Sequence, residues 1–443
     1  MSHYKPYPTY KDSGVDWLGR VPEHWQVRPL GYEIELLTGY AFPSERFDFQ
    51  DGTPLVRGDN VTEGVLRWGD KARFWPQMTP ELGRFLLEDR DVLIGMDGSK
   101  VGKNYAMVKA ADLPLLLVQR VARLRSLGRV TPDFIYRLIG SPLFRAWVDL
   151  VRTDPAIPHI SPKDISSFPI PIPPFAEQEV VLSCLDRETA RIDALIEKKT
   201  RFIELLREKR QALITHAVTK GLDPNVKMKD SGVEWLGEVP EHWVCKKLMY
   251  WMDGYGSGTT PSKDDDYCIK GGLPWVTTGE LREGLVCETD KRVTDAALSE
   301  YSALKAHPAG SLVIAMYGAT VGRLGLLGVP AALNQACFAI HPCKTISIRM
   351  LRWWFEGFRA ELIELATGAG QPNISGDKIR NLFIAAPLSL AEQEQIADQI
   401  ESRTLRIDGL VSKTERSIEL LKERRSALIT AAVTGQIDLR EAV

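Results

Sequence analysis

The sequence predicts an α+β fold with two globular domains and two long helices that form an antiparallel coiled coil. An internal repeat, short β-type runs and two heptad-patterned segments support this prediction. The first is the clearest, since the segment from Asp12 to Trp25 returns almost unchanged from Asp230 to Trp243. The offset of 218 residues (230 − 12) is far above the roughly 20–50 residues of a solenoid repeat. We therefore expect a duplicated domain-plus-helix module with pseudo-two-fold symmetry.

Composition favours two ordinary globular domains. The chain has 443 residues, of which 44% are hydrophobic and 26% charged. The start resembles no secretory signal, and no stretch approaches the roughly 18 uncharged apolar residues of a membrane span. The six cysteines form no Cys-x-x-Cys pair. We therefore expect a cytoplasmic protein with reduced thiols, no bound metal and no membrane partner.

The net charge of −2 bears on nucleic-acid binding. Non-specific DNA affinity comes from Lys and Arg side chains that neutralise phosphates. A near-neutral chain that binds DNA must therefore concentrate its cations locally or receive them from partners.

The repeats divide the chain into matching segments. Each half contains a Trp-bearing lead, a globular stretch, a Pro-rich exit and a long helix. Both globular stretches should hold a mixed, largely antiparallel sheet with helices, because the βα alternation of a doubly wound fold is absent. The expected boundaries are 1–26 for the N-terminal lead, 27–175 for domain 1, 176–219 for the central helix, 220–243 for the linker with the repeated lead, 244–390 for domain 2 and 391–443 for the C-terminal helix.

Both long helices begin after a proline-containing exit with the sequence Ala-Glu-Gln-Glu. About 44 residues at 1.5 Å per residue span roughly 65 Å, too far for one small domain to cover. Apolar residues at heptad spacing predict that the helices pack on each other. The alternative is that each helix lies on its own domain. The predicted seam consists of Ile192, Leu195, Phe202, Leu206, Leu213, Ile407, Leu410, Leu421 and Leu428, with Ile196 and Ile203 widening the stripe.

Two segments resemble catalytic motifs but lack the required chemistry. Ile172-Pro173-Pro174-Phe175 has isoleucine where an amino-methylating enzyme needs a side-chain oxygen. Gly254-Tyr255-Gly256-Ser257-Gly258 is followed by Thr, Pro and an acidic run, rather than by the helix that a cofactor loop requires. There is no Gly-x-x-x-x-Gly-Lys-Ser/Thr loop and no His-Glu-x-x-His motif. We therefore expect no catalytic residues in this chain.

Polar loops in matching places are the candidate binding elements. The loop from Asp97 to Lys103 corresponds to the loop from Tyr317 to Arg323, and both contain two glycines. Glycines allow close approach of a phosphate, and different side chains on one scaffold suit two different DNA sequences. The alternative is an ordinary β-turn with incidental lysines. The candidate DNA-contacting residues are Arg57, Asn60, Ser99, Lys100, Lys103, Thr277, Thr278, Thr320, Arg323 and Asn373.

The repeated Glu-His-Trp of the two leads, which contains His24 and His242, suggests packing and capping rather than catalysis.

In this order the motifs resemble the specificity subunits of type I restriction–modification systems over nearly the full length. The resemblance rests on the two leads, the Gly-Ala-Thr-Val-Gly-Arg loop from Gly318 to Arg323, the Gln371-Pro372-Asn373-Ile374-Ser375 segment, the Ala-Glu-Gln-Glu helix starts and the Glu-Leu-Leu helices. Domain 1 departs from the pattern, with Asp97-Gly98-Ser99-Lys100 in its loop and His159 where domain 2 has Asn373.

The resemblance implies a non-catalytic subunit with two target-recognition domains that bind the parts of a split, asymmetric double-stranded DNA site. The helix pair would set the unread gap and dock two methyltransferase subunits, and two restriction subunits would join them. S-adenosylmethionine, ATP and Mg would be bound by those partners and not by this chain. Two other hypotheses stay open: a self-contained DNA methyltransferase, and a coiled-coil interaction scaffold without a DNA role.

Overall fold

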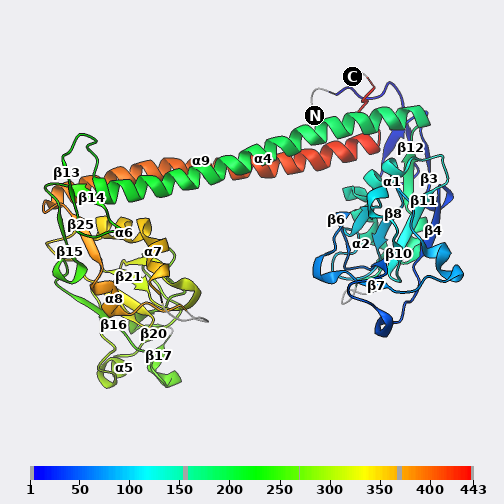
Figure 1. Cartoon of the computed structure of the whole chain (residues 1–443). Helices are drawn as coiled ribbons and strands as arrows, with labels where there is room; N and C mark the ends of the chain where they lie inside the picture. The colour runs from blue at the N-terminus through cyan, green and yellow to red at the C-terminus, as the bar shows by residue number, and fades with distance from the viewer. Residues whose placement is uncertain (1–3, 153–157, 269, 367–371, 441–443) are drawn as a thin grey trace. The chain divides into compact units, whose positions relative to one another are not determined.

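The computed structural model describes residues 4–152, 158–268, 270–366 and 372–440 (Figure 1). The chain forms two compact units. Unit 1 contains Met1–Lys199 and Arg416–Val443, and unit 2 contains Thr200–Glu415. Among the described residues, no helix combines the length and the apolar character needed to cross a membrane.

Each unit contains a short antiparallel hairpin formed by its repeated lead. In unit 1 this hairpin is β1 (Tyr10–Asp12) with β2 (Arg20–Pro22). It holds the chain's C-terminal segment: the Tyr10 hydroxyl donates to the Gly435 carbonyl at 3.1 Å, and Lys5 forms a β-bridge with Asp438. The hairpin of unit 2 is β13 (Met228–Asp230) with β14 (Glu238–Pro240).

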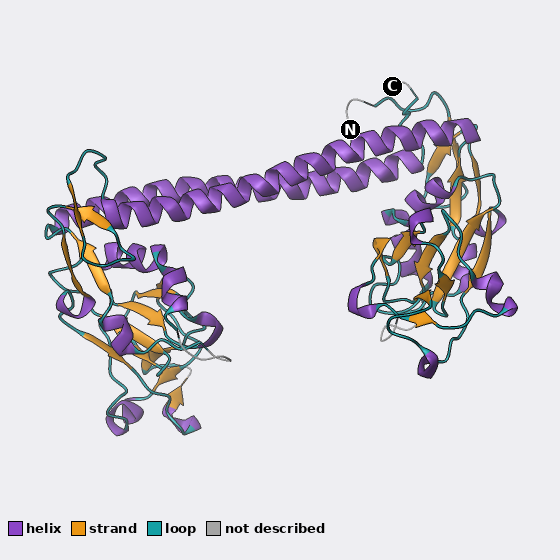
Figure 2. Cartoon of the chain, in the orientation of Figure 1, coloured by secondary structure: helices purple, strands orange, loops and turns teal. Residues whose placement is uncertain are grey.

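Unit 1 contains a mixed, mainly antiparallel sheet and smaller sheets beside it (Figure 2). The described residues form a five-stranded sheet in the order β4-β11-β8-β9-β6, a three-stranded sheet β10-β5-β7 and the pair β12-β3. Only β6–β9 and β10–β5 pair in parallel among these strands. The bounds are β3 (Gln26–Pro29), β4 (Ile34–Thr38), β5 (Thr53–Val56), β6 (Val61–Leu66), β7 (Phe74–Trp75), β8 (Val92–Gly95), β9 (Tyr105–Met107), β10 (Leu116–Leu117), β11 (Val121–Ser126) and β12 (Pro169–Ile172).

Unit 2 repeats this topology. Its described residues form the five-stranded sheet β16-β24-β21-β22-β19, the four-stranded sheet β17-β20-β18-β23 and the pair β15-β25. The bounds are β15 (Val244–Lys247), β16 (Tyr255–Ser257), β17 (Tyr267–Cys268), β18 (Leu273–Val276), β19 (Leu285–Val286), β20 (Arg292–Val293), β21 (Leu312–Ala315), β22 (Leu324–Leu327), β23 (Ala332–Leu333), β24 (Cys337–Ile340) and β25 (Phe383–Ala386). The predicted α+β fold with duplicated domains is confirmed.

One short helix of each unit is joined to a long helix through its N-cap residue. The Gln178 side-chain carbonyl accepts the backbone N–H of Thr131, the N-cap of α1, at 2.8 Å. Gln393 accepts the N–H of Ser347, the N-cap of α6, at 2.6 Å. The helices are α1 (Pro132–Ile139), α2 (Pro142–Val151) and α3 (Pro162–Ser166) in unit 1, and α5 (Asp295–Glu300), α6 (Ile348–Gly357), α7 (Arg359–Glu364) and α8 (Gly376–Arg380) in unit 2.

Two long helices, α4 (Phe175–Lys220) and α9 (Leu390–Val433), run antiparallel. In unit 2, Arg207 contacts Glu415 at 3.1 Å and Arg210 contacts Asp408 at 2.9 Å, so the numbering rises in one helix as it falls in the other. In unit 1, Arg425 of α9 contacts Asp193 of α4 at 2.9 Å. The antiparallel pairing predicted from the heptads is confirmed within each unit.

The seam differs from the prediction in one of its two heptad series. Ile192, Leu206, Ile407 and Leu428 are buried, and Leu213 and Leu421 pack at the edges of the cores. The second series was wrong by one residue. Leu195, Phe202 and Leu410 are 41%, 46% and 47% exposed, respectively, while Ile203 next to Phe202 is buried.

Two heptad series must alternate in steps of three and four residues to face a partner helix. Ile203 lies three residues before Leu206 and Phe202 lies four residues before it, so this spacing alone permits either residue. Packing against the facing helix selects Ile203, which is buried, and leaves Phe202 exposed. Leu195, Phe202 and Leu410 therefore form part of the outer surface of the long helices.

Candidate nucleic-acid interface

A polar groove of about 780 Å³ in unit 1 brings together loops from distant parts of the sequence. The loop after β5 contributes Arg57, the loop after β8 contributes Ser99 and Lys100, and the loop after β10 contributes Gln119 and Arg120. Of the predicted contacts in domain 1, Arg57, Ser99 and Lys100 therefore line one groove, while Lys103 is exposed nearby in sequence but does not line it.

The matched glycines share a backbone conformation that other residues rarely adopt. Gly98 and Gly102 have φ values of 97° and 79°, and Gly318 and Gly322 have φ values of 67° and 77°. A Cβ on Gly102 would meet Val148 at 3.2 Å, and one on Gly322 would meet Arg359 at 3.3 Å. The two loops therefore have the same backbone requirement although their other side chains differ.

Asn60 is too buried to reach a ligand in the groove, which corrects the prediction for this residue. It is fully buried, its side-chain oxygen accepts the Arg57 N–H at 3.1 Å, and its side-chain nitrogen donates to the Arg67 carbonyl at 3.0 Å. In unit 2 Glu280 has the same role, accepting the Thr277 N–H at 2.8 Å. Both residues fix the loop that follows β5 or β18, and the polar pattern alone could not distinguish this role from base contact.

The predicted residues of unit 2 lie on corresponding loops. Thr277 and Thr278 follow β18 and are half-buried, and the Thr320 hydroxyl donates to the Tyr317 carbonyl at 2.9 Å. Arg323 is half-buried in the same loop. Asn373 forms a β-bridge with Tyr317, and its side-chain oxygen is buried without a hydrogen-bond partner among the described residues. Gln371, also part of the sequence motif, lies outside the described residues.

Charge in the unit 1 groove is mixed. Arg57 contacts Asp59 at 2.9 Å, and Arg120 contacts Asp97 at 3.3 Å. Asp97 also contacts His159, the residue that replaces Asn373 of unit 2. The carboxylates hold the two arginines in place and offset part of their charge.

Sequence reasoning missed several groove residues. Arg120 has a φ of 70° and its side chain is 72% exposed, and Lys71 also lines the groove. Gln119 and Gln335 are both exposed. They occupy equivalent positions, because Gln119 follows β10, which pairs with β5 in unit 1, and Gln335 follows β23, which pairs with β18 in unit 2. The identical glutamine in both repeats was the signal that could have identified this loop.

The Glu-His-Trp leads bind the start of the long helices. In unit 1, Glu177 accepts hydrogen bonds from Trp25 Nε1 at 3.0 Å and from the Tyr7 hydroxyl at 2.7 Å, and lies 2.8 Å from His24 Nε2. In unit 2, Glu392 lies 2.9 Å from His242 Nε2 and 3.1 Å from Trp243 Nε1. The packing role predicted for the leads is confirmed, while the capping role stays a prediction, because these contacts go to glutamate side chains of the helices.

The two motif-like segments have structural roles. Ile172 is a buried residue of β12, and the following Pro173 carbonyl accepts a hydrogen bond from the Gln178 side chain at 3.0 Å. Tyr255, Gly256 and Ser257 form strand β16. The glycine-rich segment is therefore a strand and not the loop before a helix that a cofactor site requires.

Comparison with known proteins agrees with this architecture. Residues 246–419 match the family model of the type I restriction modification DNA specificity domain. The EcoKI specificity subunit of Escherichia coli strain K12 is 24% identical over 438 residues, which are 95% of this chain and 90% of that protein. The EcoAI specificity subunit of Escherichia coli is 32% identical over 185 residues, which are 41% of this chain and 31% of that protein.

Solved structures share the fold. A chain from a study of complex assembly and conformational transition of the type I R-M system has a TM-score of 0.69 at 18% identity, covering 94% of this chain and 99% of that one. The HsdS subunit from Thermoanaerobacter tengcongensis has a TM-score of 0.59 at 17% identity, covering 94% and 98%. Over nearly its full length the chain is therefore similar to type I restriction enzyme specificity subunits, and residues 246–419 match the family model of their DNA specificity domain.

Proposed function

We propose that this chain is the sequence-reading subunit of a type I restriction–modification complex and that each unit binds one part of a split, asymmetric DNA site. The observation that carries the proposal is the pair of loops with the same glycine conformations and different side chains. Lys100 in one loop corresponds to Thr320 in the other, and Arg57 corresponds to Thr277. One scaffold with two sets of side chains suits two different sequences.

The unit 1 groove supports the nucleic-acid part of the proposal. Its wall contains the cations Arg57, Lys71, Lys100 and Arg120, while the chain as a whole carries a net charge of −2. Cations gathered on one surface can neutralise phosphates even in a near-neutral protein. Polar side chains beside them can contact base edges.

The outer surfaces of the long helices support binding of two copies of one partner. Leu195 and Leu410 occupy equivalent positions at an offset of 215 (410 − 195), and they are 41% and 47% exposed. Leu205 and Leu420, at the same offset, are 46% and 50% exposed. Exposed leucines repeated on both helices indicate that each helix binds the same kind of surface.

We infer that these partners are two methyltransferase subunits, and that two restriction subunits complete the assembly. In this arrangement catalysis belongs to the partners, which bind S-adenosylmethionine, ATP and Mg. The helix pair of this chain sets the gap between the two parts of the DNA site.

Domain exchange tests the proposal. Residues 27–168 are replaced by the corresponding domain of another specificity subunit, and the methylated motif is mapped in cells that also contain the methyltransferase subunit. We expect one half of the motif to change and the other half and the gap to stay constant. Replacement of residues 244–384 is the matched control and should change only the other half. A change of both halves by a single exchange would contradict independent reading by the two units.

A further inference from the structure

Unit 1 also contains a cavity of about 560 Å³ between its globular domain and the long helices. It is separate from the groove described above, because no residue lines both. We call it the unit 1 cavity. Its wall consists of Glu63, Gly64, Val65, Tyr105, Tyr136, Arg137, Gly140, Pro142, Arg145, Asp193, Ile196, Lys422, Arg425, Ser426 and Ile429.

Positive charge exceeds negative charge in this wall. It contains the cations Arg137, Arg145, Lys422 and Arg425, against the carboxylates Glu63 and Asp193. Arg425 pairs with Asp193 at 2.9 Å, and Arg137 pairs with Asp186 outside the cavity.

Two of the cations lack a counter-charge. Within the described residues, Arg145 and Lys422 form no ion pair, and the Nε atom of Arg145 is buried without a hydrogen-bond partner. A buried guanidinium N–H without an acceptor is costly, because it has lost its water and gained nothing in return. The wall therefore contains one buried donor without an acceptor and an excess of positive charge.

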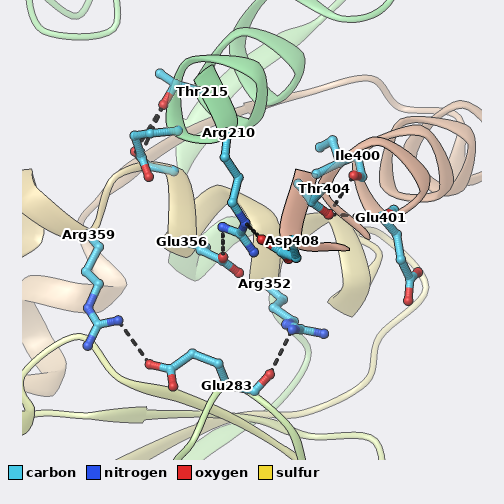
Figure 3. Close-up of polar contacts among 12 residues, drawn as sticks. Arg210, Thr215, Glu283, Arg352, Glu356, Arg359, Ile400, Glu401, Thr404 and Asp408 are labelled. Carbon is cyan, nitrogen blue, oxygen red and sulfur yellow. Dashed lines mark hydrogen bonds and ion pairs between the residues drawn. The ribbon is translucent and has the colours of Figure 1, made fainter. Parts of the chain in front are cut away.

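Unit 2 shows how the same arrangement is neutralised by the chain itself. Arg210 is the equivalent of Arg425, and Asp408 is the equivalent of Asp193, both at an offset of 215 (425 − 210 and 408 − 193). In unit 2 a second carboxylate, Glu356 at the end of α6, contacts Arg210 at 2.6 Å (Figure 3). Arg210 is therefore held between two acids.

Unit 1 has no acid at the position equivalent to Glu356. Glu356 lies nine residues after the N-cap Ser347 (356 − 347), and nine residues after the N-cap Thr131 is Gly140 (140 − 131). A Cβ at Gly140 would lie 2.4 Å from the Tyr105 hydroxyl, so the Tyr105 ring excludes a side chain there. Burial raises the pKa of Tyr105, so its hydroxyl stays protonated at neutral pH and can donate a hydrogen bond.

We propose that the unit 1 cavity binds a phosphate group, which takes the place that the Glu356 carboxylate occupies in unit 2. Arginine forms strong, often bidentate hydrogen bonds with phosphate oxygens, and lysine adds a mobile charge. The volume lies within the roughly 300–1,000 Å³ of small-ligand sites. The phosphate comes either from a free nucleotide or from the DNA backbone. The proposal is independent of sequence reading, because phosphate binding is measured without a recognition site.

The test is isothermal titration of the full-length chain with inorganic phosphate and with ATP without added metal. Arg145→Gln and Lys422→Gln each remove one unpaired cation. Each substitution removes one charged hydrogen bond to the phosphate, so each variant should bind phosphate about tenfold or more weakly. Lys422 is exposed, so its variant should fold normally, and thermal unfolding checks both variants. The matched control is Arg416→Gln, an exposed cation of α9 outside the cavity wall, whose affinity should stay within about twofold of the wild type.

A duplex-binding measurement on the same proteins identifies the source of the phosphate. A free nucleotide as occupant predicts weaker ATP binding in the variants with duplex affinity unchanged. A DNA phosphate as occupant predicts weaker duplex binding in both variants, with inorganic phosphate competing against the duplex in the wild type. Equal affinities of wild type and both variants for inorganic phosphate, ATP and duplex, or no binding of any of these ligands, would overturn the proposal. Failure of the domain exchange with intact phosphate binding would count against sequence reading alone.

Discussion

At the residue scale, the two glutamates in the first turns of the long helices belong to identical sequence motifs but differ in burial. Glu177 is buried and accepts hydrogen bonds from residues of the N-terminal lead, including the hydroxyl of Tyr7. The contacts of Glu392 with His242 and Trp243 include no residue equivalent to Tyr7. Glu392 is 35% exposed. The repeated motif predicted a packing contact in both units. The burial of the glutamate depends on the residues that precede the motif, such as Tyr7, and could not be predicted from the motif itself.

We expect Glu177→Ala to lower the free energy of unfolding by about 2–4 kcal/mol, because buried donors on Trp25 and Tyr7 lose their acceptor. Urea unfolding followed by tryptophan fluorescence measures this loss. Glu392→Ala should cost less, and Glu179→Ala, at an exposed position of the same helix, should change stability by about 0.5 kcal/mol or less. Equal losses for Glu177→Ala and Glu179→Ala would show that the buried contacts do not stabilise the lead.

A histidine pair in unit 2 predicts a pH dependence. His307 is buried, its Nδ1 lies 2.9 Å from His341 Nε2, and burial together with His341 and Lys305 lowers its pKa to about 4. His307 therefore takes up a proton near pH 6.5 in the unfolded chain but only near pH 4 in the folded chain.

Stability should consequently be highest above pH 6.5 and fall by up to about 3 kcal/mol as the pH decreases towards 4. Urea unfolding at several pH values tests this, with His307→Gln as the variant that cannot titrate. If the wild type and His307→Gln lose stability in parallel over this range, His307 is not the cause.

At the element scale, the long helices were predictable in position and pairing but not in full register. The sequence has apolar residues at two adjacent positions in successive heptads, Leu195 with Ile196 and Phe202 with Ile203. Both choices continue an apolar stripe, and only packing against the facing helix selects the second. Hydrophobicity alone cannot make this choice, because the rejected residues are equally apolar.

The corrected register predicts unequal effects of neighbouring substitutions. Ile203→Ala should destabilise the protein by about 2–4 kcal/mol, because it leaves a cavity in the buried seam. Phe202→Ala should cost about 1 kcal/mol or less, since the ring is 46% exposed. Thermal unfolding of the two variants compares them directly. A larger loss of stability for Phe202→Ala would show that Phe202, and not Ile203, faces the partner helix.

Loops between strands were the least predictable elements. The duplicated glycines located the loops after β8 and β21, because a positive φ favours glycine and glycine is visible in the sequence. The other residues of those loops do not reveal from the sequence which side chains are buried and which are exposed. Asn60 and Arg57 look equally suited to contact a base, yet one is fully buried and the other lines the groove.

At the scale of the whole molecule, duplication explains the division between common and individual features. The leads, the glycine turns and the exposed leucines recur in both halves. The leads and the glycine turns shape the fold of each unit, and the leucines are the surface proposed to contact two copies of one partner. The loop side chains that differ are those proposed to read DNA. The unit 1 cavity is a further difference, since Tyr105 and Gly140 replace an internal carboxylate there.

The most direct test of sequence reading is a map of N6-methyladenine in a methylation-free host that contains the methyltransferase subunit with or without this chain. The account predicts a split motif with a fixed gap that appears only when the chain is present. The same methylated motif in its absence would contradict the claim that this chain determines specificity.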